Sequence, residues 1–163
     1  MNKVFMEGDI IKILDFTVII FILFSVLGNV LYFVNLTISD IFIGLSVIFF
    51  NLLLFLFSFY LKQSKIANLF PIFFGILAID LFSLLPLYLT NSYLTWILAQ
   101  IFSFILTLFY LKLLLIIIGS KKSILRMIFF SLITLGIYSL YFFYSLTQEF
   151  KKFILTKKVK NEN

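Results

Sequence analysis

The chain has 163 residues, of which 63% are hydrophobic and 12% charged, and its formal net charge is +6. A soluble domain carries about 25% charged residues, so this composition, with a mean hydropathy of +1.19, predicts an integral membrane protein. The sequence contains no Cys and no His. This excludes disulfides, Cys/His metal sites and catalysis by thiol or imidazole groups.

Five apolar runs follow one another, each long enough to cross a bilayer, since about 20 apolar helical residues span a hydrocarbon core of ~30 Å. In lipid the backbone groups must be hydrogen-bonded within the segment, so runs of this length are expected to be helices. We therefore expect an all-α fold, a polytopic transmembrane helix bundle of five spans. The expected spans are residues 13–34, 41–61, 69–89, 92–118 and 127–146.

The connections between the runs are short and polar. Asn35 to Asp40 offers side chains that can cap the second helix, and Gly119 suits the C-terminus of the fourth. The runs and connections leave no room for a soluble domain. Residues 1–163 are therefore expected to form a single transmembrane domain that ends in a basic tail, 147–163.

The distribution of basic residues predicts the orientation, because Lys and Arg favour the cytoplasmic side. Loops 62–65 and 119–126 carry Lys and Arg, whereas the other two loops carry none, so the N-terminus is expected to be cytoplasmic. Five spans place the basic tail outside, against this rule. The alternative is four spans plus a re-entrant last run, which returns every basic loop and tail residue to the cytoplasmic side.

Asp80 is the most unusual residue, because it lies midway along the third run. A charged residue there costs at least ~2.5 kcal/mol on insertion scales, so it is expected to face protein or water. Lys112 lies about two turns from the cytoplasmic end of the fourth run. Spans three and four form a hairpin, and the two side chains lean toward each other, so we expect an ion pair or, alternatively, a neutral Asp80 with Lys112 reaching the interface.

Asn51 and Gln100 are further amides within the runs, and together with Asp80 and Lys112 they form the predicted intramembrane polar cluster. One interpretation is helix packing through interhelical hydrogen bonds, to which we also assign Asn29, Ser58, Ser83, Ser103 and Thr107. The other is a pathway for protons or ions. Because no second carboxylate lies near mid-depth and no Gly-rich phosphate loop occurs, we expect no enzyme, no catalytic or metal-binding residues and no cofactor.

From the third run to the fifth, the order of features resembles the Yip1 domain family, whose members have five membrane helices. The residues that carry this resemblance are Leu85-Pro86 near the end of one helix, Trp96 in the next, and Gly119 before Lys121 and Lys122. The resemblance covers about residues 40–140 and is to the bacterial branch. It implies a membrane-organising or partner-binding protein with a cytoplasmic N-terminus, an external C-terminus and no catalytic residues.

The leading hypothesis is therefore a small non-enzymatic multi-pass protein of a bacterial cytoplasmic membrane, which binds lipid, other membrane proteins or a second copy of itself. No basic surface module outside the membrane indicates a nucleic-acid partner. A small transporter or channel subunit, with its site around Asp80, is the second hypothesis. A membrane-acting defence or immunity protein is the third.

Overall fold

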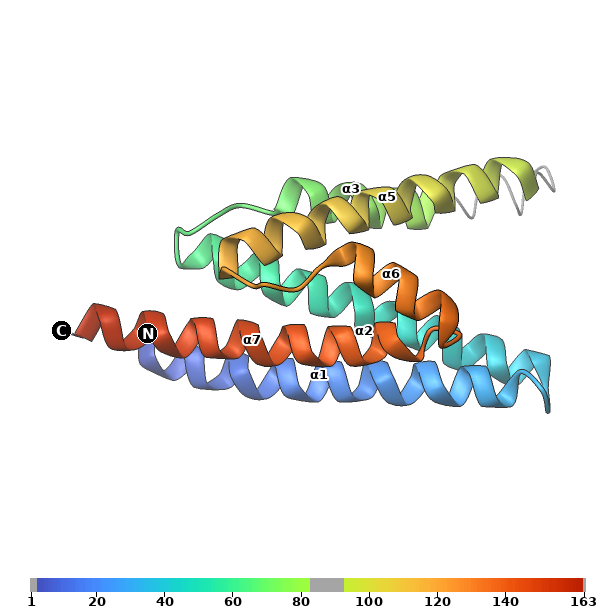
Figure 1. Cartoon of the computed structure of the whole chain (residues 1–163), viewed down its shortest axis with the longest axis horizontal. Coiled ribbons are helices and arrows are strands. Elements are labelled where there is room, and N and C mark those ends of the chain that lie inside the picture. The colour runs from blue at the N-terminus through green and yellow to red at the C-terminus, as the bar shows by residue number, and fades with distance from the viewer. Residues whose placement is uncertain (1–2, 83–92, 163) are drawn as a thin grey trace. The chain divides into compact units, whose positions relative to one another are not determined.

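The computed structural model describes residues 3–82 and 93–162, and over these residues it consists of helices and short connections without strands (Figure 1). The prediction of an all-α chain is confirmed. Ser83, Pro86 and the connection between the third and fourth runs lie outside the described residues. The described helices are α1 (Lys3–Leu31), α2 (Leu36–Gln63), α3 (Phe70–Phe82), α5 (Tyr93–Ile118), α6 (Ile124–Ile133) and α7 (Ile137–Glu162).

Three helical segments are long and apolar enough to cross a membrane: Gly8–Leu31, Leu36–Gln63 and Tyr93–Ile118. They coincide with the first, second and fourth predicted runs, which confirms a helical protein with membrane-spanning candidates. α3 and α6 are shorter apolar helices. The number of five spans is therefore not confirmed.

The contacts divide the chain into two compact units. Unit 1 comprises Met1–Leu56 and Leu125–Asn163, and unit 2 comprises Phe57–Ile124. α2 contributes its longer first part to unit 1 and its last two turns to unit 2. Each unit is described by itself below.

In unit 1, α1 and α7 lie side by side and run in opposite directions (Figure 1). Their buried apolar residues recur every four positions, which places them on one face of each helix; they are Ile10, Leu14 and Val18 on α1, and Leu146, Phe150 and Ile154 on α7. Deeper in the unit, the rings of Phe21, Phe50 and Phe143 lie within 5.1–5.8 Å of one another. This aromatic cluster joins α1, α2 and α7.

The hairpin of α1 and α2 depends on a close approach at Gly28. Ser39 Oγ donates a hydrogen bond of 2.8 Å to the Gly28 carbonyl oxygen, and a Cβ at Gly28 would lie 2.8 Å from Ile43 Cγ1. The connection between these helices behaves as the sequence predicts. Asn35 Oδ1 accepts a hydrogen bond of 3.1 Å from the Ile38 amide and so caps α2.

The fifth apolar run, predicted as one span over 127–146, is two helices in the structure. α6 ends at Ile133 and α7 begins at Ile137, and both Leu135 and Gly136 have positive φ, 50° and 90°. The Gly136 amide donates to the Ser131 carbonyl at 2.7 Å, a six-residue closure that ends a helix in a Schellman-type turn. Gly136 is the residue in this run that favours a break, but a single Gly also occurs within continuous membrane helices.

The predicted basic tail is also part of α7, because α7 continues to Glu162.

In unit 2, α3 and α5 lie against each other. α5 ends as predicted at Gly119, which has a φ of 69° and whose following residue, Ser120, donates its amide hydrogen to the Leu115 carbonyl at 2.9 Å. α2 ends in the same way at Lys65, whose φ is 54°.

Candidate functional site

Asp80 lies on α3 and contacts Ser103 on α5. The Ser103 hydroxyl donates a hydrogen bond of 2.5 Å to Asp80 Oδ1, and the contact is half-buried. A hydroxyl that donates to a carboxylate makes one of the stronger side-chain hydrogen bonds. It joins two helices at about the middle of the apolar part of unit 2.

The predicted pairing of Asp80 with Lys112 stays a prediction. Asp80 is level with Ser103, and Lys112 lies nine residues farther along α5, which is ~13 Å along a helix. Lys112 is exposed, and no ion pair links it to Asp80 among the described residues.

The other two members of the predicted cluster, Asn51 and Gln100, lie on α2 and α5. Asn51 belongs to unit 1, where its Nδ2 donates to the Val47 carbonyl at 3.1 Å and its Oδ1 is buried without a hydrogen-bond partner. Gln100 lies in unit 2, one helical turn before Ser103 on α5, and is half-buried.

A second polar contact in unit 2 was missed by the sequence analysis. The hydroxyls of Ser58 on α2 and Tyr110 on α5 are hydrogen-bonded at 2.8 Å, and both residues are fully buried. Ser58 was expected to take part in helix packing, whereas Tyr110 was counted only as part of an apolar run. In the sequence, the feature that distinguishes Tyr110 from its apolar neighbours is a hydroxyl group within the fourth run.

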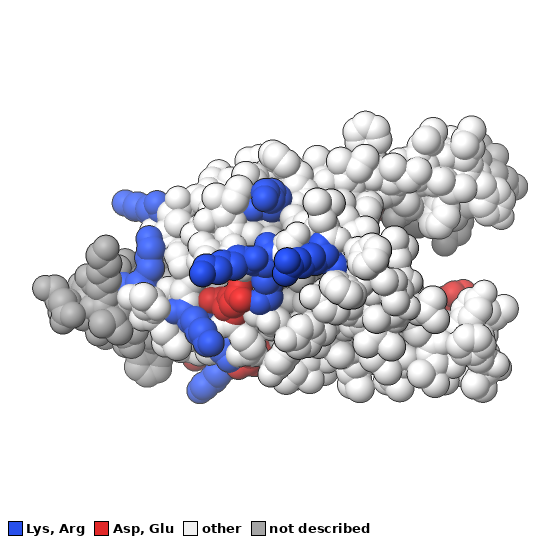
Figure 2. Space-filling view, viewed as in Figure 1, with Lys and Arg blue, Asp and Glu red and all other residues white. Residues whose placement is uncertain are grey.

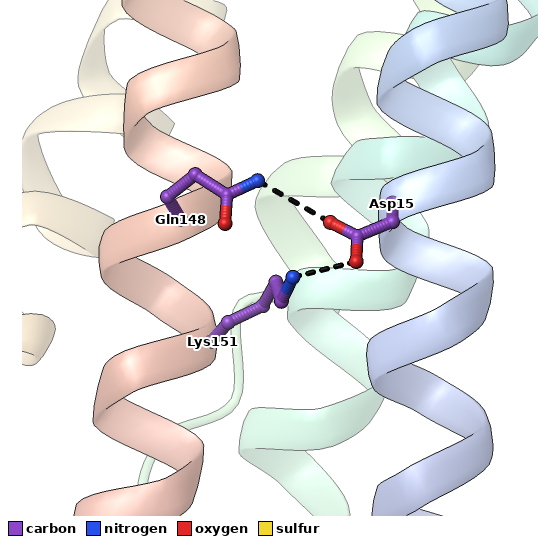
Figure 3. Close-up of polar contacts among 3 residues, drawn as sticks. All are labelled: Asp15, Gln148 and Lys151. Atoms are coloured by element: carbon purple, nitrogen blue, oxygen red, sulfur yellow. Dashed lines mark hydrogen bonds and ion pairs between the residues drawn. The ribbon is translucent and has the colours of Figure 1, made fainter.

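Unit 1 contains an ion pair between α1 and α7 (Figure 3). Lys151 Nζ on α7 lies 2.5 Å from Asp15 Oδ2 on α1, and Gln148 Nε2 donates to Asp15 Oδ1 at 3.3 Å. The Lys151 side chain is 18% exposed and that of Asp15 is 37% exposed. In the sequence Lys151 belongs to the basic tail, and no local pattern connects it with Asp15.

The charged side chains on the face drawn in Figure 2 gather in patches, and acidic atoms lie among basic ones over α7. Among the described residues, no group of three or more Asp or Glu side chains converges in a way that could hold a metal ion. The polar contacts described above join two or three side chains each. They link helices, and each carboxylate described above is engaged by a donor on another helix.

Residues 122–162 match the model of a family described as a domain of unknown function, DUF4234. The matched range begins just before α6 and ends with α7, so the similarity is confined to these two helices and the turn between them. No curated protein and no solved structure matches the chain. The fold defines the class of the protein, a helical protein with three helices long and apolar enough to span a membrane.

Proposed function

We propose that this chain is a non-enzymatic, multi-pass membrane protein that acts by binding lipids and other membrane proteins. The observation that carries the proposal is the use of polar side chains within the apolar helices. Asp80 contacts Ser103, Ser58 contacts Tyr110, and Ser39 contacts the Gly28 carbonyl. Interhelical hydrogen bonds of this kind contribute ~0.6–2 kcal/mol each to helix association, so these groups serve packing.

The finer topology that we propose is a re-entrant hairpin formed by α6 and the first part of α7. α6 has 10 residues and therefore a length of ~15 Å, half of a ~30 Å hydrocarbon core. At the turn, Leu132, Leu135 and Ile137 are exposed, Leu135 by 92%. Exposed apolar residues at a turn are unfavourable in water and favourable in hydrocarbon.

The hydrogen bonds of the turn support its placement in lipid, where an unpaired backbone group costs several kcal/mol. Thr134 serves both helices, because its Oγ1 donates to the Phe130 carbonyl at 2.7 Å and accepts from the Tyr138 amide at 3.0 Å. The amides of Thr134, Gly136 and Ile137 all donate to carbonyls within the turn or α6. The reversal therefore presents few unpaired groups.

The register of α7 against α1 gives the depth of the turn. Lys151 is level with Asp15, and Ile137, the first residue of α7, lies 14 residues before Lys151. Because the two helices are antiparallel, this offset of ~21 Å brings Ile137 level with about Asn29, near the end of α1. In the hairpin that we propose, α6 and α7 both lead back to the side of the N-terminus, which we assign to the cytoplasmic side of a bacterial membrane.

Labelling of single cysteines in this Cys-free chain tests the topology. We would introduce Thr156→Cys on α7, Asn68→Cys between α2 and α3, and Thr37→Cys at the start of α2, all at exposed positions. A membrane-impermeant maleimide is applied to intact cells and to inverted vesicles. We expect Thr156→Cys to be labelled from the same side of the membrane as Asn68→Cys, and from the side opposite to Thr37→Cys. A Yip1-like chain with an external C-terminus gives the opposite result, which would overturn the hairpin.

Flux measurements test the binding function against the transporter hypothesis. The full-length protein is reconstituted in liposomes that contain a pH-sensitive dye, and a pH or potassium gradient is imposed. We expect no flux above that of empty liposomes. Flux that is abolished by Asp80→Asn would instead assign the contact of Asp80 with Ser103 to a conduction pathway.

A further inference from the structure

Unit 2 has an unbalanced charge distribution. Between Phe57 and Ile124 the sequence has five lysines, while Asp80 is its one acidic residue. The lysines lie toward the ends of α2 and α5, and we call them the lysine belt; they are Lys62, Lys65, Lys112, Lys121 and Lys122. Asp80 is distant from the belt, since it contacts Ser103, nine residues before Lys112 on α5.

A side-chain contact between α2 and α5 shows that Lys62 and Lys112 lie at nearly the same depth. Ser58 on α2 is hydrogen-bonded to Tyr110 on α5, and the two helices end on the same side of unit 2 (Figure 1). Lys62 follows Ser58 by four residues and Lys112 follows Tyr110 by two, a difference of ~3 Å along the helices. α2 and α5 therefore each place one lysine, Lys62 and Lys112, at nearly the same level of unit 2.

The first residue of α3 lies at this level as well. Lys62 Nζ lies 4.9 Å from the centre of the Phe70 ring. A cation–π contact holds the ammonium in place without neutralising its charge. Lys112 is exposed on the flank of α5, where its long stem allows the ammonium to reach the headgroup region.

We propose that the lysine belt binds anionic phospholipid headgroups on the cytoplasmic side. This inference rests on the proposed membrane-binding function and specifies its ligand. The belt lies at the apolar–polar boundary of unit 2, where the negative charges available in a bilayer are those of lipid headgroups, and basic residues there attract anionic lipids. An acidic protein would meet Lys65 and Lys121 in the loops, but not Lys112, which is set back on an apolar helix flank.

Unit 1 provides a contrast within the same chain. Its Lys151 is paired with Asp15, and its α7 also carries Lys152 and Lys157, which are exposed on a helix that bears Glu149. Lys157 contacts the Phe153 ring at 5.7 Å, much as Lys62 contacts Phe70. Lys152 and Lys157 are therefore a matched control pair, with the same charge and exposure outside unit 2.

The test measures binding of phosphatidylglycerol to the full-length protein by native mass spectrometry, with phosphatidylcholine as the uncharged comparison. We expect tighter binding of phosphatidylglycerol by the wild type. Lys62→Gln with Lys112→Gln is expected to weaken it by about 25-fold, roughly five-fold per lysine. The control, Lys152→Gln with Lys157→Gln, is expected to leave it unchanged, and Lys62→Arg with Lys112→Arg should retain it even if the Gln variant folds poorly.

Several outcomes would overturn the proposal. Equal binding of the two lipids, or equal weakening in the belt and control variants, would mean that the belt has no specific role. Binding of polyglutamate by the wild type but not by the belt variant, with lipid binding unaffected, would assign the belt to an acidic protein. Each of these results is independent of the flux assay, so the belt can fail while the proposed non-transporting function stands, or the reverse.

Discussion

Asp15 and Lys151 form an ion pair of 2.5 Å between α1 and α7, although 136 residues separate them in the chain (Figure 3). The pair aligns the two helices in opposite directions, so that the start of α1 and the end of α7 lie at the same end of unit 1 (Figure 1). Gln148 donates to the other oxygen of the same carboxylate. This contact of three side chains thus links α1 to α7 at a defined register.

Replacement of Lys151 by Met is expected to lower the free energy of unfolding by about 1 kcal/mol, because Asp15 loses its ionic partner while remaining partly exposed to solvent. The measurement is thermal or denaturant unfolding of the full chain in one detergent. Lys152→Met is the control, since Lys152 is exposed, and its effect should stay within about 0.5 kcal/mol.

An exchange of the two charges tests whether the contact itself is responsible. Asp15→Lys combined with Lys151→Asp should recover part of the stability that either single change removes. If the double variant is as unstable as the sum of the single variants, the pair does not hold α1 against α7.

Gly28→Ala is expected to destabilise the α1–α2 hairpin by about 1–3 kcal/mol, the range for overpacking a close contact. The new Cβ would lie 2.8 Å from Ile43 Cγ1 and 3.2 Å from the Ile43 backbone nitrogen. Gly44→Ala is the matched control on α2, because nothing lies within 4 Å of its added Cβ, and the better helix propensity of Ala should stabilise it by up to about 1 kcal/mol. Equal effects of the two changes in unfolding experiments would contradict the close approach.

Leu135→Gly is expected to stabilise the turn between α6 and α7 by up to about 1 kcal/mol, because Leu135 has a φ of 50°, where residues with a Cβ are strained. Gly136→Ala is expected to destabilise by about 1–2 kcal/mol, since Gly136 has a φ of 90°. Both variants are compared with the wild type by thermal unfolding. A continuous helix through 127–146 predicts the reverse order, with Leu135→Gly the harmful change.

A double-mutant cycle of Asp80→Leu and Ser103→Ala is expected to give a coupling energy of about 1–2 kcal/mol, because the hydroxyl donates to a carboxylate at 2.5 Å. The same cycle with Lys112→Leu in place of Ser103→Ala should give a coupling near zero, since no ion pair joins Lys112 to Asp80. Coupling energies are read from unfolding in one detergent. Strong coupling of Asp80 with Lys112 would restore the ion pair expected from the sequence.

The apolar runs were predictable because the requirement for internal hydrogen bonds in lipid leaves little choice except helix. The helix ends at Asn35 and Gly119 were also predictable, since a capping side chain and a residue free to adopt positive φ are local signals. The break at Leu135 was not. Leu is an unfavourable residue for this conformation, and the flanking apolar residues suit one long helix as well as two short ones.

The polar contacts could be predicted only in part. Asp80 was singled out because a mid-depth carboxylate is costly in hydrocarbon, but its partner depends on how far α5 slides along α3, which a sequence without a strong packing periodicity leaves open. Tyr110 and Ser58 form a buried hydrogen bond from residues that separately resemble ordinary members of apolar runs. Asp15 and Lys151 lie near opposite ends of the sequence, and no local pattern connects them.

The sequence by itself determined that this protein is helical and rich in segments able to cross a membrane, because hydrophobicity and backbone hydrogen bonding act locally along the chain. The tertiary structure alone decided the partners of Asp80 and Asp15, the reversal at Leu135 and Gly136, and the common depth of Lys62 and Lys112. These features depend on the register between helices. Register is determined by contacts between residues far apart in the chain, such as Gly28 with Ile43 and Phe21 with Phe143.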